Sequence, residues 1–290
     1  MSKDDAMIRT KGLIEIDHFG CDYIGDGQVT AAVADVSILV RPGEFVSIVG
    51  PSGCGKSTLL NAVAGFRAPT RGRVRVDGET IRAPGADRGM VFQQYSLFPW
   101  KTVRQNVEFG LKMQGMGASQ RESKARTLLS IAGLLDFEDH YPDRLSGGMK
   151  QRVGIVRALA TGPKVLLLDE PFGALDAQTR VIMQQILTNI WQRLRISVLF
   201  VTHDIDEAIF LSDRIYVMTA RPGEVKAEVP IDLPRPRDPD CMMAADFLAL
   251  RRELVTLIRE ESLRAMGGEL AGGLAGIGVT ADSGSLADLL

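Results

Sequence analysis

The chain has 290 residues, of which 45% are hydrophobic and 24% are charged, and this ordinary globular usage excludes a fibrous or wholly disordered protein. Its formal net charge of −2 provides no general positive field, which argues against nucleic acid as a partner. The 3 cysteines, Cys21, Cys54 and Cys241, are too few and too scattered for a disulfide framework or a zinc site, and they fit a reducing compartment.

The first fifty residues have the pattern of short strands. Isoleucines alternate with acidic residues over 14–17, as in a strand with one buried face. We expect a loop at the glycines of residues 20–27, followed by a second strand over 33–40. Residues 45–50 (FVSIVG) form an apolar run that ends in glycine, which is typical of a buried parallel strand.

The middle of the chain alternates between strand and helix patterns. Residues 72–81 predict a hairpin, with a tight turn at Asp77-Gly78. Residues 102–160 have helical spacing and indicate a helical insert within an α/β core. Two further apolar runs, 164–170 and 197–204, predict buried strands joined by a helix. A strand, a helix and a strand in succession predict a parallel βαβ unit.

The end of the chain differs in composition. A proline-rich segment at 233–239 marks a boundary. Apolar residues at helical spacing from Phe247 to Ile258 then indicate one face of a helix. Residues 266–290 are rich in glycine, and we expect this tail to be mobile because glycine raises the entropy cost of ordering it.

A phosphate-binding motif, G-x-x-x-x-G-K-[ST], occupies residues 50–57 between a predicted buried strand and a predicted helix. Its glycines let backbone N–H groups curve around an anion, and the helix directs its positive dipole end at the same place. Lys56 adds a full charge near the β- and γ-phosphates, and the Ser57 hydroxyl is a hard oxygen ligand for Mg²⁺. A chance glycine-rich turn does not explain a complete motif in this context. The candidate phosphate-binding residues are Gly50, Pro51, Ser52, Gly53, Cys54, Gly55, Lys56 and Ser57.

An acidic pair, Asp169 and Glu170, follows the apolar run 166–168. Ligands of open α/β sheets bind at the carboxyl ends of the strands. Because adjacent strand residues point in opposite directions, Asp169 can face Mg²⁺ while Glu170 faces elsewhere. A second carboxylate there could polarise a water molecule for attack on a γ-phosphate, although a solvated charge at the end of a strand is the simpler alternative.

A second helix start is also suited to an anion. Ser146 is a natural N-cap, and Gly147 and Gly148 allow close backbone approach. This helix start lies on the predicted helical insert, far along the chain from Lys56. The chain thus has one phosphate loop but two helix starts suited to an anion. This mismatch is resolved if each chain offers its second helix start to the nucleotide of a partner copy. Two-fold pairing would then form two composite sites.

The segment LSGGMKQR, which contains Ser146, resembles the signature motif of the ATP-binding-cassette (ABC) ATPases. Other segments follow in that family's order: Gln93 in VFQQ resembles the Q-loop glutamine, Asp176 in ALD the D-loop, and His203 in VTHD the switch histidine. Tyr23 falls where the family places an aromatic residue that stacks on adenine.

The resemblance covers residues 12–232 and implies an α/β fold. It implies a P-loop NTPase (RecA-like) core with an antiparallel β subdomain and a helical subdomain inserted at about residues 95–162. An N-terminal tail, residues 1–11, would precede this domain. A C-terminal linker and helix at 233–265 would follow it, and a flexible tail at 266–290 would end the chain.

The resemblance also implies a role for each matching residue. The implied ATP-binding residues are Tyr23 and those from Gly50 to Thr58, the magnesium residues are Ser57, Gln93 and Asp169, the catalytic residues are Gln93, Glu170 and His203, and the residues that reach the partner's ATP are Ser146, Gly147, Gly148 and Asp176. Taken singly, several of these have simpler alternatives. Gln93 could be a solvated loop residue, His203 a capping residue, and Tyr23 a side chain packed on the sheet.

Several segments, including FQQYSLFPWKTVRQNVEFGL and the ARPG at residues 220–223, are similar to bacterial importer ATPases of the nitrate, sulfonate and taurine group. Such importers imply a membrane permease, a second copy of this chain and, indirectly, a periplasmic solute-binding protein as partners, with no nucleic acid. In the family, residues 94–101 face the permease, although Trp100 could instead lie in the core. The sequence has no apolar run of roughly 20 residues and no signal core, so we expect a peripheral protein on the cytoplasmic side of the inner membrane.

Other functions are also open to a chain with these motifs. DNA-repair ABC ATPases carry a long coiled-coil insert between the phosphate loop and the signature motif, and the 90 positions from Lys56 to Ser146 exclude one. ABC ATPases that act in translation carry two cassettes in tandem, whereas this sequence shows one. The subunit of an exporter is disfavoured by the importer-like sequence after Gln93. An unrelated P-loop kinase would not explain LSGGMKQR. The sequence leaves the transported solute open.

Overall fold

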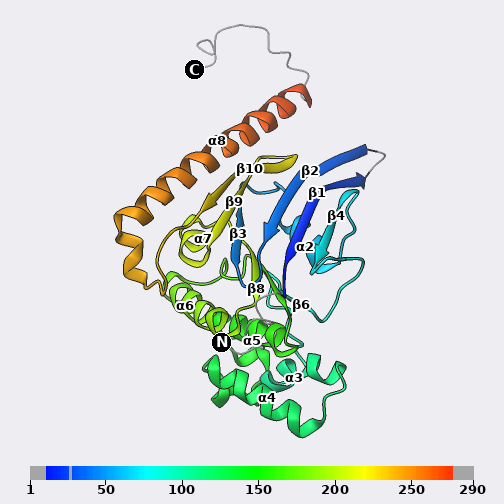
Figure 1. Ribbon diagram of the computed structural model, residues 1–290, viewed down its shortest axis with the longest axis vertical. Helices are drawn as coiled ribbons and strands as arrows, with labels where there is room; N and C mark the ends of the chain where they lie inside the picture. The colour runs from blue at the N-terminus through cyan, green and yellow to red at the C-terminus, as the bar shows by residue number, and fades with distance from the viewer. Residues whose placement is uncertain (1–10, 26–27, 277–290) are drawn as a thin grey trace.

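The computed structural model describes residues 11–25 and 28–276, and a continuous sheet runs through the middle of these residues (Figure 1). The strands are β1 (Ile14–Gly25), β2 (Gln28–Val40), β3 (Phe45–Val49), β4 (Arg71–Val76), β5 (Glu79–Thr80), β6 (Arg88–Val91), β7 (Val165–Asp169), β8 (Ser197–Val201), β9 (Arg214–Met218) and β10 (Gly223–Pro230). Their order across the 10-stranded sheet is β5-β4-β1-β2-β10-β9-β3-β8-β7-β6.

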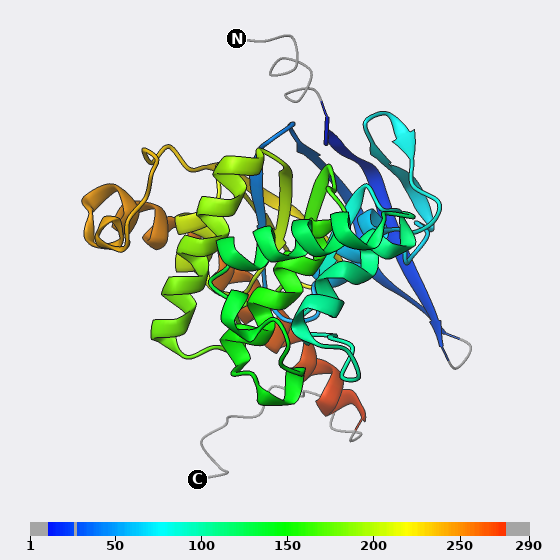
Figure 2. The same ribbon diagram turned by 90° about the horizontal axis from the view of Figure 1, so that it is seen from below.

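Helices flank the sheet and form one end of the molecule (Figures 1 and 2). The α-helices are α2 (Lys56–Ala64), α3 (Val103–Met113), α4 (Ala118–Ile131), α5 (Gly147–Ala160), α6 (Ala177–Leu194), α7 (Ile205–Leu211) and α8 (Ala245–Gly276). The 3₁₀ turns are η1 (Leu135–Phe137), η2 (Pro142–Arg144) and η3 (Pro239–Met243). None of the helices in the described part of the chain is both long and apolar enough to cross a bilayer.

The parallel part of the sheet consists of β6, β7, β8, β3 and β9. Every residue of β3 and of β8 is buried, because helices cover both faces of this part of the sheet. The carboxyl ends of β3, β6, β7 and β8 therefore meet at one edge. The parallel βαβ unit predicted from the two apolar runs is confirmed as β7, α6 and β8.

The antiparallel part joins β1 to β2 and β4. The loop that we expected at residues 20–27 is wrong for its first residues, because β1 continues to Gly25 and pairs Tyr23 with Thr30 of β2. Register shifts between Ile16 and Asp22 absorb the irregular sequence. Gly20 permits a close approach within the sheet, since a Cβ there would lie 2.9 Å from the Ala34 carbonyl oxygen.

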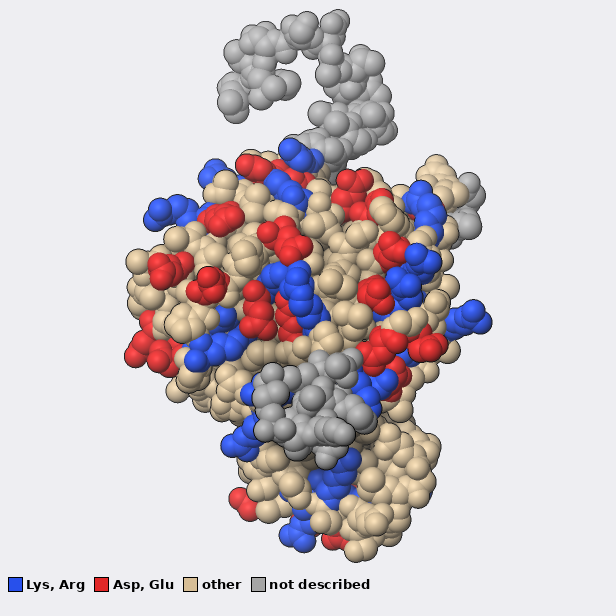
Figure 3. All heavy atoms as spheres, viewed as in Figure 1, with Lys and Arg blue, Asp and Glu red and all other residues tan. Residues whose placement is uncertain are grey.

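The helices α3, α4 and α5 form one end of the molecule, with their own hydrophobic cluster (Figure 1). Val107 and Leu111 of α3, Leu129 of α4 and Val153 of α5 are fully buried there. On the face in Figure 3, basic and acidic side chains are interspersed over the sheet-bearing part, whereas this end has larger uncharged areas. These helices lie within the segment in which we predicted a helical subdomain.

The C-terminal helix α8 packs against α7 and β9. Phe247 and Leu254 are buried in this contact, so the predicted apolar face is confirmed. The tail that we expected from Met266 instead begins as helix, because α8 runs to Gly276. The rest of the expected tail, residues 277–290, lies outside the described residues, as do residues 1–10 of the expected N-terminal tail.

Candidate active site

The phosphate loop connects the end of β3 to the start of α2. Gly55 occupies the N-cap position of α2 with φ 98°, in the left-handed region that favours glycine. A Cβ at Gly55 would lie 2.5 Å from the Val33 side chain, so a larger residue would push the loop away from β2. The backbone N–H groups of this loop and the positive end of α2 create the anion-binding concavity that the motif predicts.

Lys56 is held inside this loop with only 6% of its surface exposed. Its Nζ donates to the carbonyl oxygens of Gly50 at 2.8 Å and Pro51 at 2.9 Å. Cys54 lies buried beside it, and burial raises the pKa of the Cys54 thiol. A phosphate entering the loop would meet an ammonium group already oriented by the backbone, while a neutral Cys54 fills space below it.

A hydroxyl and a carboxylate converge next to Lys56. Ser57 Oγ donates to Asp169 Oδ1 over 2.9 Å, which joins the start of α2 to the end of β7. Burial raises the pKa of the Asp169 carboxyl, and the nearby Glu170 raises it further. Two hard oxygen groups, one of them a desolvated carboxylate, are a donor set that fits Mg²⁺. Within the described ranges, no group of three or more His, Cys, Asp and Glu side chains is arranged to hold a metal ion, so Mg²⁺ here would depend on the Ser57 hydroxyl, Asp169 and oxygens of the nucleotide.

A second cluster forms around Glu170. Gln93 Nε2 donates to Glu170 Oε2 over 3.3 Å, and His203 Nδ1 lies 3.1 Å from the same oxygen. These residues follow β6, β7 and β8, so the carboxyl ends of neighbouring strands bring them together. Glu170 has φ 43°, a left-handed backbone conformation that residues other than glycine rarely adopt. Such a conformation costs of order 1 kcal/mol for a residue other than glycine and is typical of functional sites.

Tyr23 lies on β1 beside the phosphate loop. Its hydroxyl is 3.1 Å from Thr58 Oγ1, and the Arg67 guanidinium carbon lies 3.7 Å from its ring centroid. Arg67 therefore covers one face of the ring. With 41% of Tyr23 exposed, the ring remains accessible to a stacked aromatic ligand.

Many of these groups line a cavity of about 470 Å³, whereas Asp169 and His203 lie outside its lining and reach it through their contacts with Ser57 and Glu170. The cavity is lined by Tyr23, Ala32, Ser52, Gly53, Gly55, Lys56, Ser57, Thr58, Gln93, Glu170 and Arg221. Three of the residues in and beside it, Ala32, Arg67 and Arg221, were missed by the sequence analysis. Arg221 belongs to the ARPG segment, which attracted notice only as a subfamily resemblance. The turn that contains Arg221 packs on the phosphate loop, since a Cβ at Gly223 would lie 2.1 Å from the Cys54 carbonyl oxygen. The positive charge of Arg221 within this short segment is the sequence signal that could have identified it.

The residues predicted to reach a partner's nucleotide lie elsewhere. Ser146 caps α5 by accepting a hydrogen bond from the Met149 backbone N–H at 3.3 Å. Asp176 caps α6 in the same way, by accepting from the Thr179 N–H at 2.9 Å. A Cβ on Gly148 would lie 2.5 Å from the Thr179 methyl, so the two helix starts touch. Ser146, Gly147, Gly148 and Asp176 are all absent from the lining of the cavity around Lys56.

Comparison with known proteins places the chain in a family. The family model described as ABC transporter matches residues 33–173. An uncharacterized ABC transporter ATP-binding protein of Methanocaldococcus jannaschii is 46% identical over 269 residues, which cover 92% of this chain and 100% of that protein. This chain belongs to the ABC transporter ATP-binding proteins. The family that LSGGMKQR suggested is therefore confirmed.

Several relatives of this ABC protein have names that state a transported solute. The nitrate import ATP-binding protein NrtD of Synechocystis is 53% identical over 221 residues, covering 76% of this chain and 83% of NrtD. The taurine import ATP-binding protein TauB of Rhizobium johnstonii is 48% identical over 227 residues, covering 77% of this chain and 86% of TauB.

A solved structure supports the predicted fold of this ABC protein. The post-hydrolysis dimer of the ATP-binding cassette MJ0796, bound to ADP and Pi, matches with a TM-score of 0.69 and 35% identity. The match covers 76% of this chain and 100% of the MJ0796 chain. The predicted P-loop NTPase fold is confirmed, and the chain is an ATP-binding ABC ATPase.

Proposed function

We propose that this ABC ATPase hydrolyses MgATP in composite sites between two copies of the chain, and that closure of the pair drives a membrane importer for small solutes. The observation that carries the chemistry is that Gln93 and Glu170 line the phosphate cavity and that Gln93 and His203 both contact one carboxylate oxygen of Glu170. The import role is supported by relatives named for nitrate import and taurine import.

Substrate binding would begin at the phosphate loop. Lys56 and the backbone N–H groups of residues 50–58 would hold the phosphates, and Tyr23 would stack on the adenine ring. Ser57, Asp169 and Gln93 would hold Mg²⁺, which supplies charge neutralisation at the β- and γ-phosphates when bound. The hydrogen bond between Ser57 and Asp169 supports this assignment, because it brings their oxygens to one place.

Hydrolysis would then need a base and a group that steadies the γ-phosphate. Glu170 would accept a proton from water as the water oxygen bonds to the γ-phosphorus, while the bond from phosphorus to the bridging oxygen breaks and leaves ADP. Gln93 would orient that water molecule, and His203 would donate to a γ-phosphate oxygen. The contacts of Gln93 and His203 with one oxygen of Glu170 support this division of work.

The second half of each site would come from a partner copy. Ser146, Gly147 and Gly148 would place a helix start over the partner's γ-phosphate, and Asp176 would couple the two sites. Two features support this arrangement: these residues lie outside the cavity that contains Lys56, and the related cassette MJ0796 was solved as a dimer.

A membrane permease would receive the motion of this pair. A groove of about 380 Å³ lies between the sheet edge at β6 and the helices α3 and α5, and Phe92, Phe98 and Phe109 line it. Trp100, next to this groove, is 70% exposed, so the alternative that it belongs to the core is wrong. An exposed tryptophan beside an apolar groove is typical of a protein interface. The chain would then be peripheral on the cytoplasmic face of the membrane, and a periplasmic solute-binding protein would deliver the cargo.

Isolation of the membrane complex through this subunit tests the import role. A tagged chain should recover permease subunits, and the recovered complex should hydrolyse ATP. Ligand binding by the associated solute receptor should then identify the cargo. Trp100→Ala should reduce permease recovery, whereas Met243→Ala, which truncates an exposed apolar side chain on η3, should leave it unchanged. Recovery of ribosomes or of an exporter-type membrane subunit would overturn the import role and leave the ATPase chemistry intact.

A further inference from the structure

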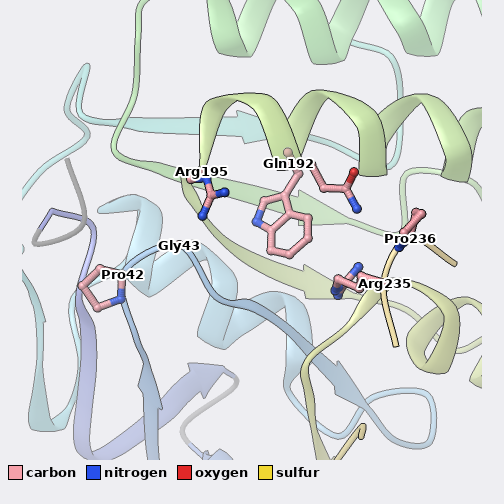
Figure 4. A pocket seen from close by; sticks show the side chains of 7 residues that line it. Pro42, Gly43, Gln192, Arg195, Arg235 and Pro236 are labelled. Carbon is pink, nitrogen blue, oxygen red and sulfur yellow. The ribbon is translucent and has the colours of Figure 1, made fainter. Parts of the chain in front are cut away.

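Two of the cavities in the described part of the chain lie at opposite ends of the central strands. The larger, of about 590 Å³, lies before the start of β3 and beside Trp191 (Figure 4). The smaller is the nucleotide cavity of about 470 Å³, and its lining includes two basic side chains, Lys56 and Arg221. The proposed ATPase chemistry uses Lys56 and leaves Arg221 without a role.

Arg221 belongs to a short turn that connects β9 to β10. The Thr219 hydroxyl closes this turn by accepting a hydrogen bond from the Glu224 N–H at 2.9 Å. The turn packs closely on the phosphate loop, because a Cβ on Gly223 would lie 2.1 Å from the Cys54 carbonyl oxygen. Since β9 runs parallel to β3, the turn after its carboxyl end lies at the same edge of the sheet as the phosphate loop.

The charge of Arg221 is available to a ligand in this cavity. Within the part of the chain that the structure describes, its exposed guanidinium group makes no hydrogen bond or ion pair. The carboxylate in the same lining, Glu170, is in contact with Gln93 and His203 instead. A guanidinium group binds phosphate oxygens through paired, charge-assisted hydrogen bonds. Arg221 therefore suits the phosphates of a nucleotide that Lys56 holds.

A buried carboxylate on α8 holds the turn in place. Glu261 is only 1% exposed, and its Oε2 accepts a hydrogen bond over 3.0 Å from the N–H of Ala220, the residue before Arg221. Its Oε1 forms ion pairs with Lys226 of β10 at 2.9 Å and with Arg264 at 2.8 Å. Buried carboxylates need such partners, so the contact with Ala220 is part of the packing of α8 on the sheet.

We propose that Arg221 binds the phosphates of the nucleotide, and that Glu261 positions Arg221 by fixing the backbone of the turn. The helix α8 then influences nucleotide affinity although none of its residues lines the cavity. This role rests on the nucleotide binding in the proposed function. It holds even if Glu170 is not the base or the chain does not drive an importer, because MgADP binding to the isolated chain requires neither.

Calorimetric titration of the full chain with MgADP tests the role of Arg221. Arg221→Gln should weaken binding about tenfold, because a charge-assisted hydrogen bond is lost. Arg221→Lys keeps the positive charge and should bind within about threefold of the wild type. Arg259→Gln removes an exposed charge from α8 and should leave the affinity unchanged. Wild-type affinity in Arg221→Gln, or an equal loss in Arg259→Gln, would overturn the proposal.

Three substitutions on α8 test the positioning role of Glu261. Glu261→Met fills the same space but removes the acceptor for the Ala220 N–H, so it should weaken MgADP binding by up to about tenfold. Glu261→Gln keeps an acceptor and should retain most of the affinity. Glu260→Met is the matched control, because Glu260 pairs with Lys226 but does not contact the turn, and it should bind as the wild type does. Equal losses in the Gln and Met variants of Glu261 would contradict the positioning role.

A double substitution separates positioning from general destabilisation. If Glu261 acts through Arg221, adding Glu261→Met to Arg221→Gln should not weaken MgADP binding further, whereas additive losses would overturn the coupling. In the complex that hydrolyses ATP, each single variant should raise KM and leave kcat unchanged. If Glu261→Met does not fold, Ala220→Gly provides the second variant, because it loosens the same turn and leaves the buried cluster intact. Wild-type affinity in Ala220→Gly would then overturn the positioning role.

Discussion

The two halves of the proposed ATP site differ in how much of their chemistry one chain assembles. In the phosphate half, Ser57 contacts Asp169, and Glu170 contacts both Gln93 and His203. In the signature half, Ser146 uses its hydroxyl to cap its own helix. The difference teaches that folding of one chain brings together the groups that we propose to hold and attack a phosphate, whereas the donors of the signature half lie apart from them.

The origin of this difference lies in the positions of the two halves. The groups of the phosphate half follow β3, β6, β7 and β8, and a parallel sheet places the carboxyl ends of its strands at one edge. The signature half belongs to the start of α5, a helix that packs on the helical end through Val153 and on the sheet-side core through Ile155 and Leu159. The phosphate half is thus assembled by the ends of neighbouring strands, whereas the signature half is assembled at the start of one helix.

Removal of the proposed base should produce the largest effect. If turnover did not fall, the contrast between the two halves of the site would lose its chemical basis. Glu170→Gln should lower the turnover of ATP by about 10²- to 10⁴-fold, the usual contribution of a general base, while ATP binding is retained. Because ATP then persists in the site, the variant should also form a dimer when ATP is added. Phosphate release and light scattering measure the two effects.

The control for this change is Glu79→Gln, which removes a carboxylate from an exposed edge strand. It should leave both turnover and ATP-dependent dimerisation as they are in the wild type. Unchanged turnover in Glu170→Gln, with the permease present, would remove Glu170 as the base and would leave the phosphate half without its attacking chemistry.

A bulky charge in the signature half should separate binding from turnover. Ser146→Arg should lower turnover at least about 10²-fold by obstructing the helix start that meets the partner's phosphate, while the isolated monomer binds ATP as tightly as the wild type. Calorimetric titration of the monomer and phosphate release by the complex are the two measurements. The comparison predicts this separation, because Ser146 is not part of the cavity around Lys56.

Loss of the helix cap could by itself affect the Ser146 variant, so a second substitution is needed. Ser146→Asp keeps an N-cap acceptor for the Met149 N–H and repels a phosphate, so it should also lose turnover without unfolding α5. Ser123→Arg on the exposed side of α4 is the control for the added charge and should be active. A Ser146→Arg monomer that binds ATP weakly would contradict action on the partner's nucleotide.

A buried carboxyl beside the phosphate half, that of Glu207, lowers the free energy of unfolding as the pH rises, and unfolding at several pH values can measure this loss. Glu207 of α7 is buried next to the switch segment, and burial raises the pKa of its carboxyl to about 7, against a hydrogen bond from Thr202 that lowers it. The folded state therefore binds a proton more tightly than the unfolded state, whose carboxyl has the ordinary value of 4.5. The stability contributed by this proton is complete below pH 4.5 and is lost as the pH rises to about 7.

Glu207→Gln removes this titration and keeps an acceptor for Thr202. The free energy of unfolding of the wild type should fall relative to the variant by up to about 3 kcal/mol between pH 4.5 and 7, and the difference should be constant at higher pH. Chemical denaturation at several pH values gives this difference directly. If the difference in the free energy of unfolding between the wild type and Glu207→Gln did not change with pH, Glu207 would not be the titrating group. The same conclusion would follow if Glu79→Gln gave an equal pH dependence.

The sequence predicted the parts of the site that are local in the chain. The phosphate loop, the acidic pair after β7 and the helix start at Ser146 each follow from a short motif and its flanking pattern. The family resemblance added Gln93 and His203, but the convergence of their side chains on one oxygen of Glu170 depends on the pairing of β6, β7 and β8, which no short window contains.

The features that the sequence did not predict also depend on contacts between segments that are distant in the chain. Glycine at residue 20 suggested a loop, yet pairing with β2 and β4 holds β1 in extended form through register shifts. Arg67 was missed because its contact with Tyr23 joins segments distant in sequence. The cavity beside Trp191 brings together a turn, a helix end and a linker, and no periodicity predicts such a meeting.

The smallest expected effect concerns Tyr23 and tests whether the antiparallel part of the sheet belongs to the phosphate half. Tyr23→Ala should weaken ATP binding by the monomer about tenfold, because stacking of a base on an aromatic ring contributes roughly 1–3 kcal/mol. Tyr23→Phe keeps the ring, loses the contact with Thr58 and should weaken binding much less. Tyr141→Ala is the control on the helical end. Equal losses in the Ala and Phe variants would assign the effect to the Thr58 contact instead of to stacking, and Tyr23 would then act by positioning the helix start that holds the phosphates.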